Sequence, residues 1–170
     1  MKSIPIDLTF DQTQKAMEEA RRRHLQSKEL KQKPRGGGPA QDQKGLEIDI
    51  AGALGEMAAA SYLGLEEFVF TFNKNWGVYD LPPNIDVKTA LGHSRRLHIF
   101  LDEKPEKLFV HATYKYEKLQ LHGWAYGGQV MKPEYIDNPR QRGDSYFVPS
   151  HALNPIADLK AILSDLGYSK

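Results

Sequence analysis

The chain has 170 residues and no cysteine; 40% of its residues are hydrophobic, 26% are charged, and its net charge is +1. This length and composition predict one globular domain with a proper core, and they exclude disulfides and thiolate zinc sites. The near-neutral charge gives no general argument for a nucleic-acid partner, so any such argument depends on local clusters of charge.

The sequence shows no apolar run long enough for a secretory signal or for a membrane span. The absence of cysteine fits a reducing compartment. We therefore expect a soluble, cytoplasmic protein.

A basic helix is predicted from about residue 10. Thr9 and Gln12 have the spacing of a capping box, and residues 11–33 contain no helix breaker. Residues 34–45 hold three glycines between two prolines, which predicts a linker. We expect residues 1–45 to form a basic helical arm with its linker, and residues 46–170 to form the compact domain.

The basic run over residues 21–35 has two interpretations. It could bind backbone phosphates, with the linker letting the arm close around a duplex, or it could be an ordinary solvated helix face. The candidate DNA-binding residues of this run are Arg21, Arg22, Arg23, Lys31, Lys33 and Arg35.

A second helix is predicted between Asp49 as its N-cap and Gly64 as its C-terminal stop, because apolar residues recur there at helical spacing. Glu56 lies beside this apolar stripe, among very small side chains. A lone acid in that setting lets another surface approach closely. The plain alternative is a solvated glutamate.

Short apolar runs with alternation and aromatic content predict strands after this helix. They cover residues 68–72, 78–81, 84–90, 96–101, 107–114, 119–127 and 145–149. A closing helix is predicted between Pro155 and Gly167. Helices before and after a run of strands predict an α/β or α+β fold, with one mainly central sheet flanked by helices.

Asp80, Asp86 and Lys88 lie close together around a pair of prolines. In a strand over residues 84–90, Ile85 and Val87 point to one face, whereas Asp86 and Lys88 point to the other, into a cleft or solvent. A chain reversal centred on the second proline pairs residues whose numbers sum to 166. That register places Asp80 directly opposite Asp86.

Two facing carboxylates repel each other unless a proton or a cation lies between them. Lys88 supplies one positive charge, but Mg²⁺, which prefers carboxylate oxygens and keeps several waters, neutralises the pair better. Asp80 and Asp86 suit that ion, and Glu56 could complete a direct or outer contact. Lys88 could then orient a water nucleophile or stabilise charge on a phosphate. The plain alternative is an exposed Lys–Asp pair worth little stability.

Two further groups follow this strand. Arg95 and Arg96 could steer phosphates towards the metal, or they could belong to a plain surface loop. His98 alternates with apolar neighbours, so it could share the face of Lys88, or it could be a hydrogen-bonded structural histidine.

A helix carrying GALGEMAAASYLG, an acid in one strand and IDVK in the next together resemble the PD-(D/E)XK nuclease superfamily, above all its small resolvase-like and phage-type members. The resemblance covers about residues 48–115. By position, it implies Asp80 as the first acid, Asp86 as the (D/E) residue and Lys88 as the lysine. It implies Glu56 as the glutamate on the helix, and the carbonyl of Val87 as a further metal ligand.

The resemblance implies a restriction-endonuclease-like fold, Mg²⁺ as cofactor with Mn²⁺ as a substitute, and hydrolysis of DNA phosphodiester bonds. A phage-encoded protein that acts in a host cytoplasm is one setting that fits the resemblance, and the biological pathway stays open. Cleavage of both strands needs two active sites or two successive nicks, so a homodimer is one expectation. Two other classes stay open: a nuclease-like module that binds nucleic acid without cleaving it, and an interaction protein unrelated to nucleic acid.

Overall fold

The structure, a computed structural model, describes residues 3–30, 43–65, 68, 70, 79–92, 96–139 and 143–168. Its elements in chain order are β1 (Ile4–Ile6), α1 (Phe10–Glu29), α2 (Gln43–Leu63), β2 (Ile85–Leu91), β3 (Arg96–Phe100), β4 (Leu108–Lys115), β5 (Lys118–Tyr126), α3 (Gly127–Val130), β6 (Ile136–Asp137), β7 (Ser145–Pro149) and α4 (Ile156–Asp165). Short 3-10 helices occupy Pro133–Tyr135 and Ser150–Ala152.

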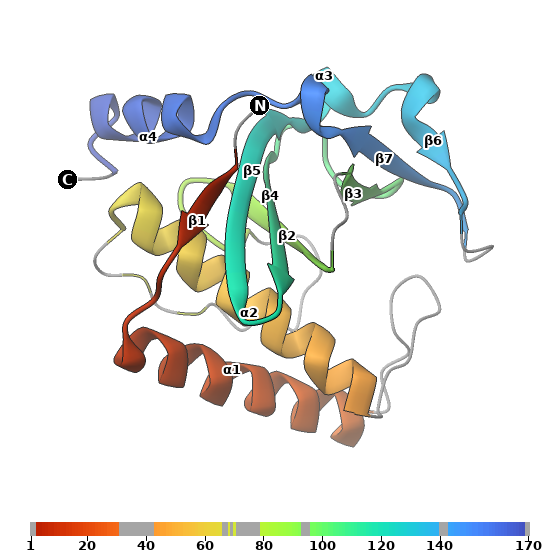
Figure 1. Cartoon of the computed structure of the whole chain (residues 1–170). Helices are drawn as coiled ribbons and strands as arrows, with labels where there is room; N and C mark the ends of the chain where they lie inside the picture. The colour runs from red at the N-terminus through yellow and green to blue at the C-terminus, as the bar shows by residue number, and fades with distance from the viewer. Residues whose placement is uncertain are drawn as a thin grey trace.

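Two sheets and two long helices make up one α/β domain (Figure 1). The larger sheet has the strand order β1-β5-β4-β2, in which β2 runs parallel to β4 while the other neighbours are antiparallel. The smaller, antiparallel sheet has the order β3-β7-β6. The predicted α/β class with a central mixed sheet is confirmed, and β2 lies at the edge of that sheet.

Helix α1 begins as the sequence predicts. The Thr9 hydroxyl accepts from the backbone of Gln12, whose side chain accepts in return from the backbone of Thr9, so the capping box is complete. Its fully buried Ala16 and Ala20 belong to one apolar cluster with alanines of α2. Small side chains at this contact let the two helices approach closely.

The N-terminal residues are part of the domain, not an appended arm. Strand β1 pairs with β5 in the larger sheet, and α1 packs along α2 (Figure 1). The expected boundary between residues 45 and 46 falls inside α2. The local composition suggested an arm. Both contacts that attach these residues to the domain involve distant parts of the sequence, so no local pattern indicates them. The expected linker lies largely outside the described residues.

Helix α2 ends as predicted and begins earlier than predicted. Gly64 follows its last residue with a φ of +74°, the left-handed conformation of a helix stop. The helix starts at Gln43, so Asp49 lies within it and is not its N-cap. No proline interrupts residues 43–48, and Gly45 is buried, so packing outweighs the local start signal.

Each face of the larger sheet has its own apolar cluster. Ile85 and Val87 face the cluster that contains Leu63 of α2 and residues of α4. Phe109, which pairs with Asp86 in the parallel β2–β4 register, belongs to the other cluster, formed with the smaller sheet. The predicted alternation along β2 is therefore confirmed, with Asp86 on the side of Phe109.

Most of the predicted strands match the structure, namely β2, β3, β4, β5 and β7, and the closing helix matches α4. Residues 79–81 form no strand, since only Leu81 makes a bridge there. The prediction over residues 68–72 lies mostly outside the described residues. Strands β1 and β6 were not predicted. None of the helices in the described ranges is long and apolar enough to cross a bilayer.

Candidate active site

Asp80 and Asp86 flank a tight chain reversal. Leu81 and Ile85 form an antiparallel bridge, with N–O distances of 3.0 Å and 2.9 Å, so the predicted register is confirmed at this pair. The Asp80 backbone N–H also donates to the Ile85 carbonyl, at 2.9 Å, which keeps Asp80 beside the start of β2. The Val87 backbone N–H donates to Asp80 Oδ2 at 2.8 Å, which fixes the Asp80 carboxylate against β2.

Asp86 is buried and belongs to a closed ring of ion pairs. Lys88 Nζ lies 2.8 Å from Asp86 Oδ1, and Lys107 Nζ lies 3.0 Å from Asp86 Oδ2. Glu103 joins the two lysines, with Oε1 at 3.1 Å from Lys88 Nζ and Oε2 at 2.9 Å from Lys107 Nζ. We call Asp86, Lys88, Glu103 and Lys107 the ion-pair ring. The predicted open cleft beside Asp86 is filled, in this structure, by these side chains.

Glu103 and Lys107 were missed in the sequence. They come from the turn between β3 and β4, where residues 102–107 are mostly charged. Glu103 had no predicted role, and Lys107 was expected as the first residue of the strand over residues 107–114. Their spacing of four residues was the one available signal, and it is common at surfaces. Only the parallel pairing of β2 with β4 brings this turn to Asp86, and that pairing is not readable from local sequence.

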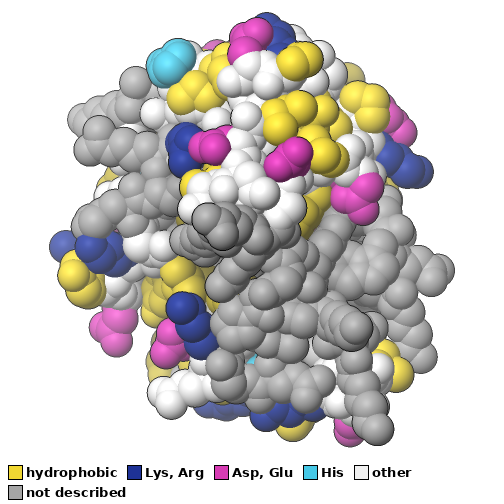
Figure 2. Space-filling view, turned by 90° about the vertical axis from the view of Figure 1, so that its right-hand side faces the viewer, with side chains coloured by type: hydrophobic (Ala, Val, Ile, Leu, Met, Phe, Trp, Pro, Cys, Tyr) yellow, Lys and Arg dark blue, Asp and Glu magenta, His cyan; other side chains and the backbone are white. Residues whose placement is uncertain are grey.

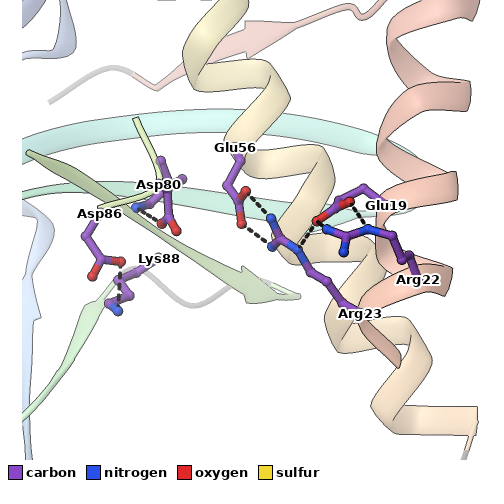
Figure 3. Close-up of polar contacts among 8 residues, drawn as sticks. Glu19, Arg22, Arg23, Glu56, Asp80, Asp86 and Lys88 are labelled. Atoms are coloured by element: carbon purple, nitrogen blue, oxygen red, sulfur yellow. Dashed lines mark hydrogen bonds and ion pairs between the residues drawn. The ribbon is translucent and has the colours of Figure 1, made fainter. Parts of the chain in front are cut away.

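Glu56 reaches the site from α2 and is clamped by α1. Arg23 Nη1 and Nη2 donate to Glu56 Oε1 and Oε2 at 2.6 Å and 2.8 Å, and Arg23 Nε donates to Glu19 at 2.7 Å. Figure 3 shows the Glu56 carboxylate turned towards Arg23, with Asp80 between Glu56 and Asp86. The electrostatic influence of both acids on Asp80 agrees with that placement.

The carboxyl groups of Asp80 and Glu56 are poorly compensated. Burial, with the charges of Glu56 and Asp86, raises the pKa of Asp80 well above its usual value. Burial also raises the pKa of Glu56, because the Arg23 contacts only partly offset the loss of water. Among the described residues, Asp80 forms no ion pair. A cation near Asp80 would therefore be stabilised by charge that is already in place.

The two lysines of the ring remain charged. Burial opposes the charge of Lys88, but Asp86 and Glu103 raise its pKa above the usual value. Burial likewise opposes the charge of Lys107, and the same two acids raise its pKa. Burial would raise the pKa of Glu103, yet the lysines outweigh it and lower that pKa to about 2.

The residues fit a divalent ion as a two-carboxylate site. Within the described ranges, no group of three or more His, Asp or Glu side chains is arranged to hold a metal. Mg²⁺ is nevertheless commonly held by one or two carboxylates, with water and substrate phosphate filling the other positions. Asp80 and Asp86 supply that type of donor, and both Asp86 oxygens are engaged by lysine ammonium groups that an ion would have to displace. Both Glu56 oxygens bond to Arg23, which suits an outer contact, and the carbonyl of Val87 as a ligand stays a prediction.

The predicted DNA-binding residues differ in their exposure to solvent and in their contacts with acidic side chains. Arg21 is exposed on α1. Arg22 is half-exposed and donates to Glu19, while Arg23 is only partly exposed and its guanidinium contacts Glu19 and Glu56. The phosphate contact of each stays a prediction. Four other candidates lie outside the described residues: Lys31, Lys33, Arg35 and Arg95.

Arg96 and His98 lie on the smaller sheet. Arg96 contacts Asp137 at 3.0 Å, and its guanidinium lies 5.0 Å from the centre of the Phe147 ring. His98 stacks on Phe147 with the ring centres 4.8 Å apart. Leu97 alternates with His98 and packs with Phe109, so His98 points away from the Asp86 side and does not share the face of Lys88.

One face of the molecule carries no broad basic patch on its described upper half (Figure 2). There the Lys and Arg side chains lie beside acidic ones, among hydrophobic side chains. This mixed charge gives the upper half of that face little attraction for a polyanion.

Comparisons with protein-family models, with curated proteins and with solved structures found no match to this chain. The resemblance to the PD-(D/E)XK nucleases therefore depends on the residues themselves. Any argument for an activity has to come from the geometry around Asp80 and Asp86.

Proposed function

We propose that the protein is a divalent-metal-dependent phosphodiesterase of the PD-(D/E)XK type that cleaves DNA. One observation carries this proposal. The Asp80 carboxylate accepts from the Val87 backbone beside Asp86 and feels the charge of Asp86, and Lys88 contacts Asp86. With Glu56 nearby on α2, the residues that the motif requires come from a helix, a turn and a strand to one place.

Each residue has a role in this proposal. Asp80 and Asp86 would hold Mg²⁺ or Mn²⁺, with Glu56 in an outer contact oriented by Arg23. When bound, such an ion supplies a water of lowered pKa and neutralises charge on the phosphate. Lys88, whose raised pKa keeps it protonated at neutral pH, donates to a phosphate oxygen or orients the attacking water.

DNA as the substrate is part of the same proposal. Among the described candidates for a backbone phosphate contact, Arg21, Arg22 and Arg96 are exposed. Cleavage of both strands of a duplex would need a homodimer or two successive nicks by one site.

A second candidate is a nuclease-like module that binds nucleic acid without cleaving it. A specific observation favours it: both oxygens of Asp86 contact ammonium groups, and both oxygens of Glu56 contact Arg23. Four carboxylate oxygens engaged in this way stabilise a fold without any metal ion. In that case the ion-pair ring persists in the working protein, and no metal ion displaces its lysines.

Conversion of supercoiled plasmid to nicked circles in Mg²⁺ tests the proposal. We expect nicking by the wild type, and at least about a hundredfold less by Asp86→Asn and Lys88→Met, because each removes a group that stabilises the transition state. Asp165→Asn, an exposed change on α4, is the matched control and should nick like the wild type. EDTA should stop all nicking.

Circular dichroism of each variant should accompany the assay, to distinguish a loss of activity from a loss of fold. Nicking that is equal in the wild type and Asp86→Asn contradicts the proposed site. A folded wild type that slows the migration of plasmid in a gel-shift assay but never nicks it favours the binding module. A wild type that neither binds nor nicks DNA favours an interaction protein of another kind.

A further inference from the structure

Asp86 carries a second ammonium contact that the motif does not include. Lys107 lies just before β4, its side chain is 7% exposed, and its Nζ is 3.0 Å from Asp86 Oδ2. Lys88 Nζ contacts the other oxygen of the same carboxylate, Asp86 Oδ1, at 2.8 Å. Asp86 therefore has both of its oxygens next to fixed positive charges.

Glu103 holds both ammonium groups in place. Its two oxygens contact one lysine each, at 3.1 Å and 2.9 Å. Buried charges are costly unless every one of them is paired on good geometry. In the ion-pair ring each group has two partners of opposite charge, so Lys107 is fixed at Asp86 by a second acid and does not depend on Asp86 alone.

The charge count shows what Lys107 does to a cation at this place. The ion-pair ring has two positive and two negative groups, and Asp80 adds one negative charge in its ionised form, which is the form that binds a cation. A divalent ion would bring this set from −1 to +1. Without Lys107 the same ion would bring the set from −2 to 0. Lys107 therefore stabilises the ion-free site and opposes entry of the ion.

Resting on the function proposed above, we propose that Lys107, positioned by Glu103, is a built-in counter-ion of Asp86 that competes with the divalent cation and so sets the affinity of the site for it. Binding of the ion exchanges one cation for another at Asp86 Oδ2. The ammonium group of Lys107 stays with Glu103 when it leaves Asp86. The hydrogen bond from Lys107 Nζ to Asp86 Oδ2 gives way to a contact between the ion and that oxygen, and no covalent bond changes.

Titration of the full chain with Mn²⁺ alone, with free Mn²⁺ followed by electron paramagnetic resonance, tests this role without any activity measurement. We expect Lys107→Met, which removes the charge and keeps most of the volume, to bind Mn²⁺ about tenfold tighter than the wild type or more. Lys107→Arg keeps the charge and should bind like the wild type. Lys104→Met, an exposed change in the same turn, is the matched control and should also be unchanged.

The outcomes separate this inference from the proposed function. Wild type that binds Mn²⁺ as tightly as Lys107→Met overturns the counter-ion role and leaves the metal site standing. Folded proteins that all fail to bind Mn²⁺ overturn the metal site, and with it both proposals. If Lys107→Met does not fold, Lys107→Gln replaces it, because a neutral amide can still donate to Asp86 and Glu103.

Discussion

Arg23 of α1 donates two parallel hydrogen bonds to Glu56 of α2, from Nη1 to Oε1 at 2.6 Å and from Nη2 to Oε2 at 2.8 Å. The same guanidinium bonds to Glu19 of its own helix at 2.7 Å. These contacts join the N-terminal helix to the helix that supplies the candidate site glutamate. Helix α1 therefore helps to hold the candidate site glutamate in position.

Arg23→Met should destabilise the protein strongly. It leaves the buried carboxylates of Glu19 and Glu56 without their shared partner, which costs about 3 kcal/mol of unfolding free energy. Urea unfolding followed by circular dichroism measures this. Arg21→Met on the exposed face of the same helix is the control and should stay within about 0.5 kcal/mol of the wild type. Equal stability of the two variants would contradict the clamp.

Asp80→Asn should stabilise the ion-free protein at neutral pH. Because the folded-state pKa of Asp80 is raised, the folded state binds this proton more tightly, and stability falls as pH rises through that pKa. The amide oxygen can still accept from Val87. In EDTA at pH 8, thermal melts should show a gain of about 1 kcal/mol or more, and the gain should vanish near pH 4.

A less stable Asp80→Asn at pH 8 would mean that a cation of the protein already neutralises Asp80. Asp165→Asn is the control for removing a carboxyl at the surface. It should leave the melting temperature nearly unchanged at both pH values.

Glu103→Gln should have the opposite pH dependence. The pKa of Glu103 is lowered to about 2 from an ordinary value of 4.5, so its stabilising effect is complete above pH 4.5 and is lost as pH falls towards 2. At pH 7 the variant should lose roughly 2–4 kcal/mol of unfolding free energy, and at pH 2–3 most of that difference should disappear. Denaturant unfolding at a series of pH values measures it.

Glu106→Gln, an exposed change in the same turn, should match the wild type throughout this pH series. A loss of stability at Glu103→Gln that did not change between pH 7 and pH 3 would point to packing and not to charge.

Gly55→Ala and Gly52→Ala should shift stability in opposite directions. A Cβ at Gly55 would lie 1.8 Å from Thr89 Oγ1, so α2 would have to move away from β2, at a cost of about 1–3 kcal/mol. A Cβ at Gly52 meets nothing within 4 Å, so the usual gain of replacing a helical glycine, up to about 1 kcal/mol, remains. Thermal melts of the two variants compare them directly, and a tolerated Gly55→Ala would contradict the close approach.

Local patterns predicted the parts of the fold that local physics controls. The Thr9 capping box, the Gly64 stop and the alternation along β2 depend on neighbouring residues, and all three are present. The pairing of Leu81 with Ile85 followed from the proline-centred turn between them. These features place Asp80 near Asp86 without any knowledge of the remaining chain.

Features that depend on contacts between distant residues were not predicted from the sequence. Strand β1 is three residues long and exists through its pairing with β5, more than a hundred positions away. Arg23 looked like one of several basic helix residues, and only the packing of α1 on α2 gives it Glu56 as a partner. The contacts of Lys107 with Asp86 and Glu103 likewise depend on the pairing of β2 with β4, which no local pattern indicates.

The parallel pairing of β2 with β4 ties the chemistry of the site to the order in which the chain is completed. Lys107 follows Asp86 by 21 positions, and it arrives only when the strand after it has docked along β2. Parallel neighbours need a crossover between them, so this docking closes a long loop. A chain ending before residue 107 would keep Lys88 beside Asp86 but would lack the ammonium group that contacts Asp86 Oδ2. Full pairing of the aspartate therefore requires the later half of the larger sheet, and shorter fragments leave one of its oxygens without that partner.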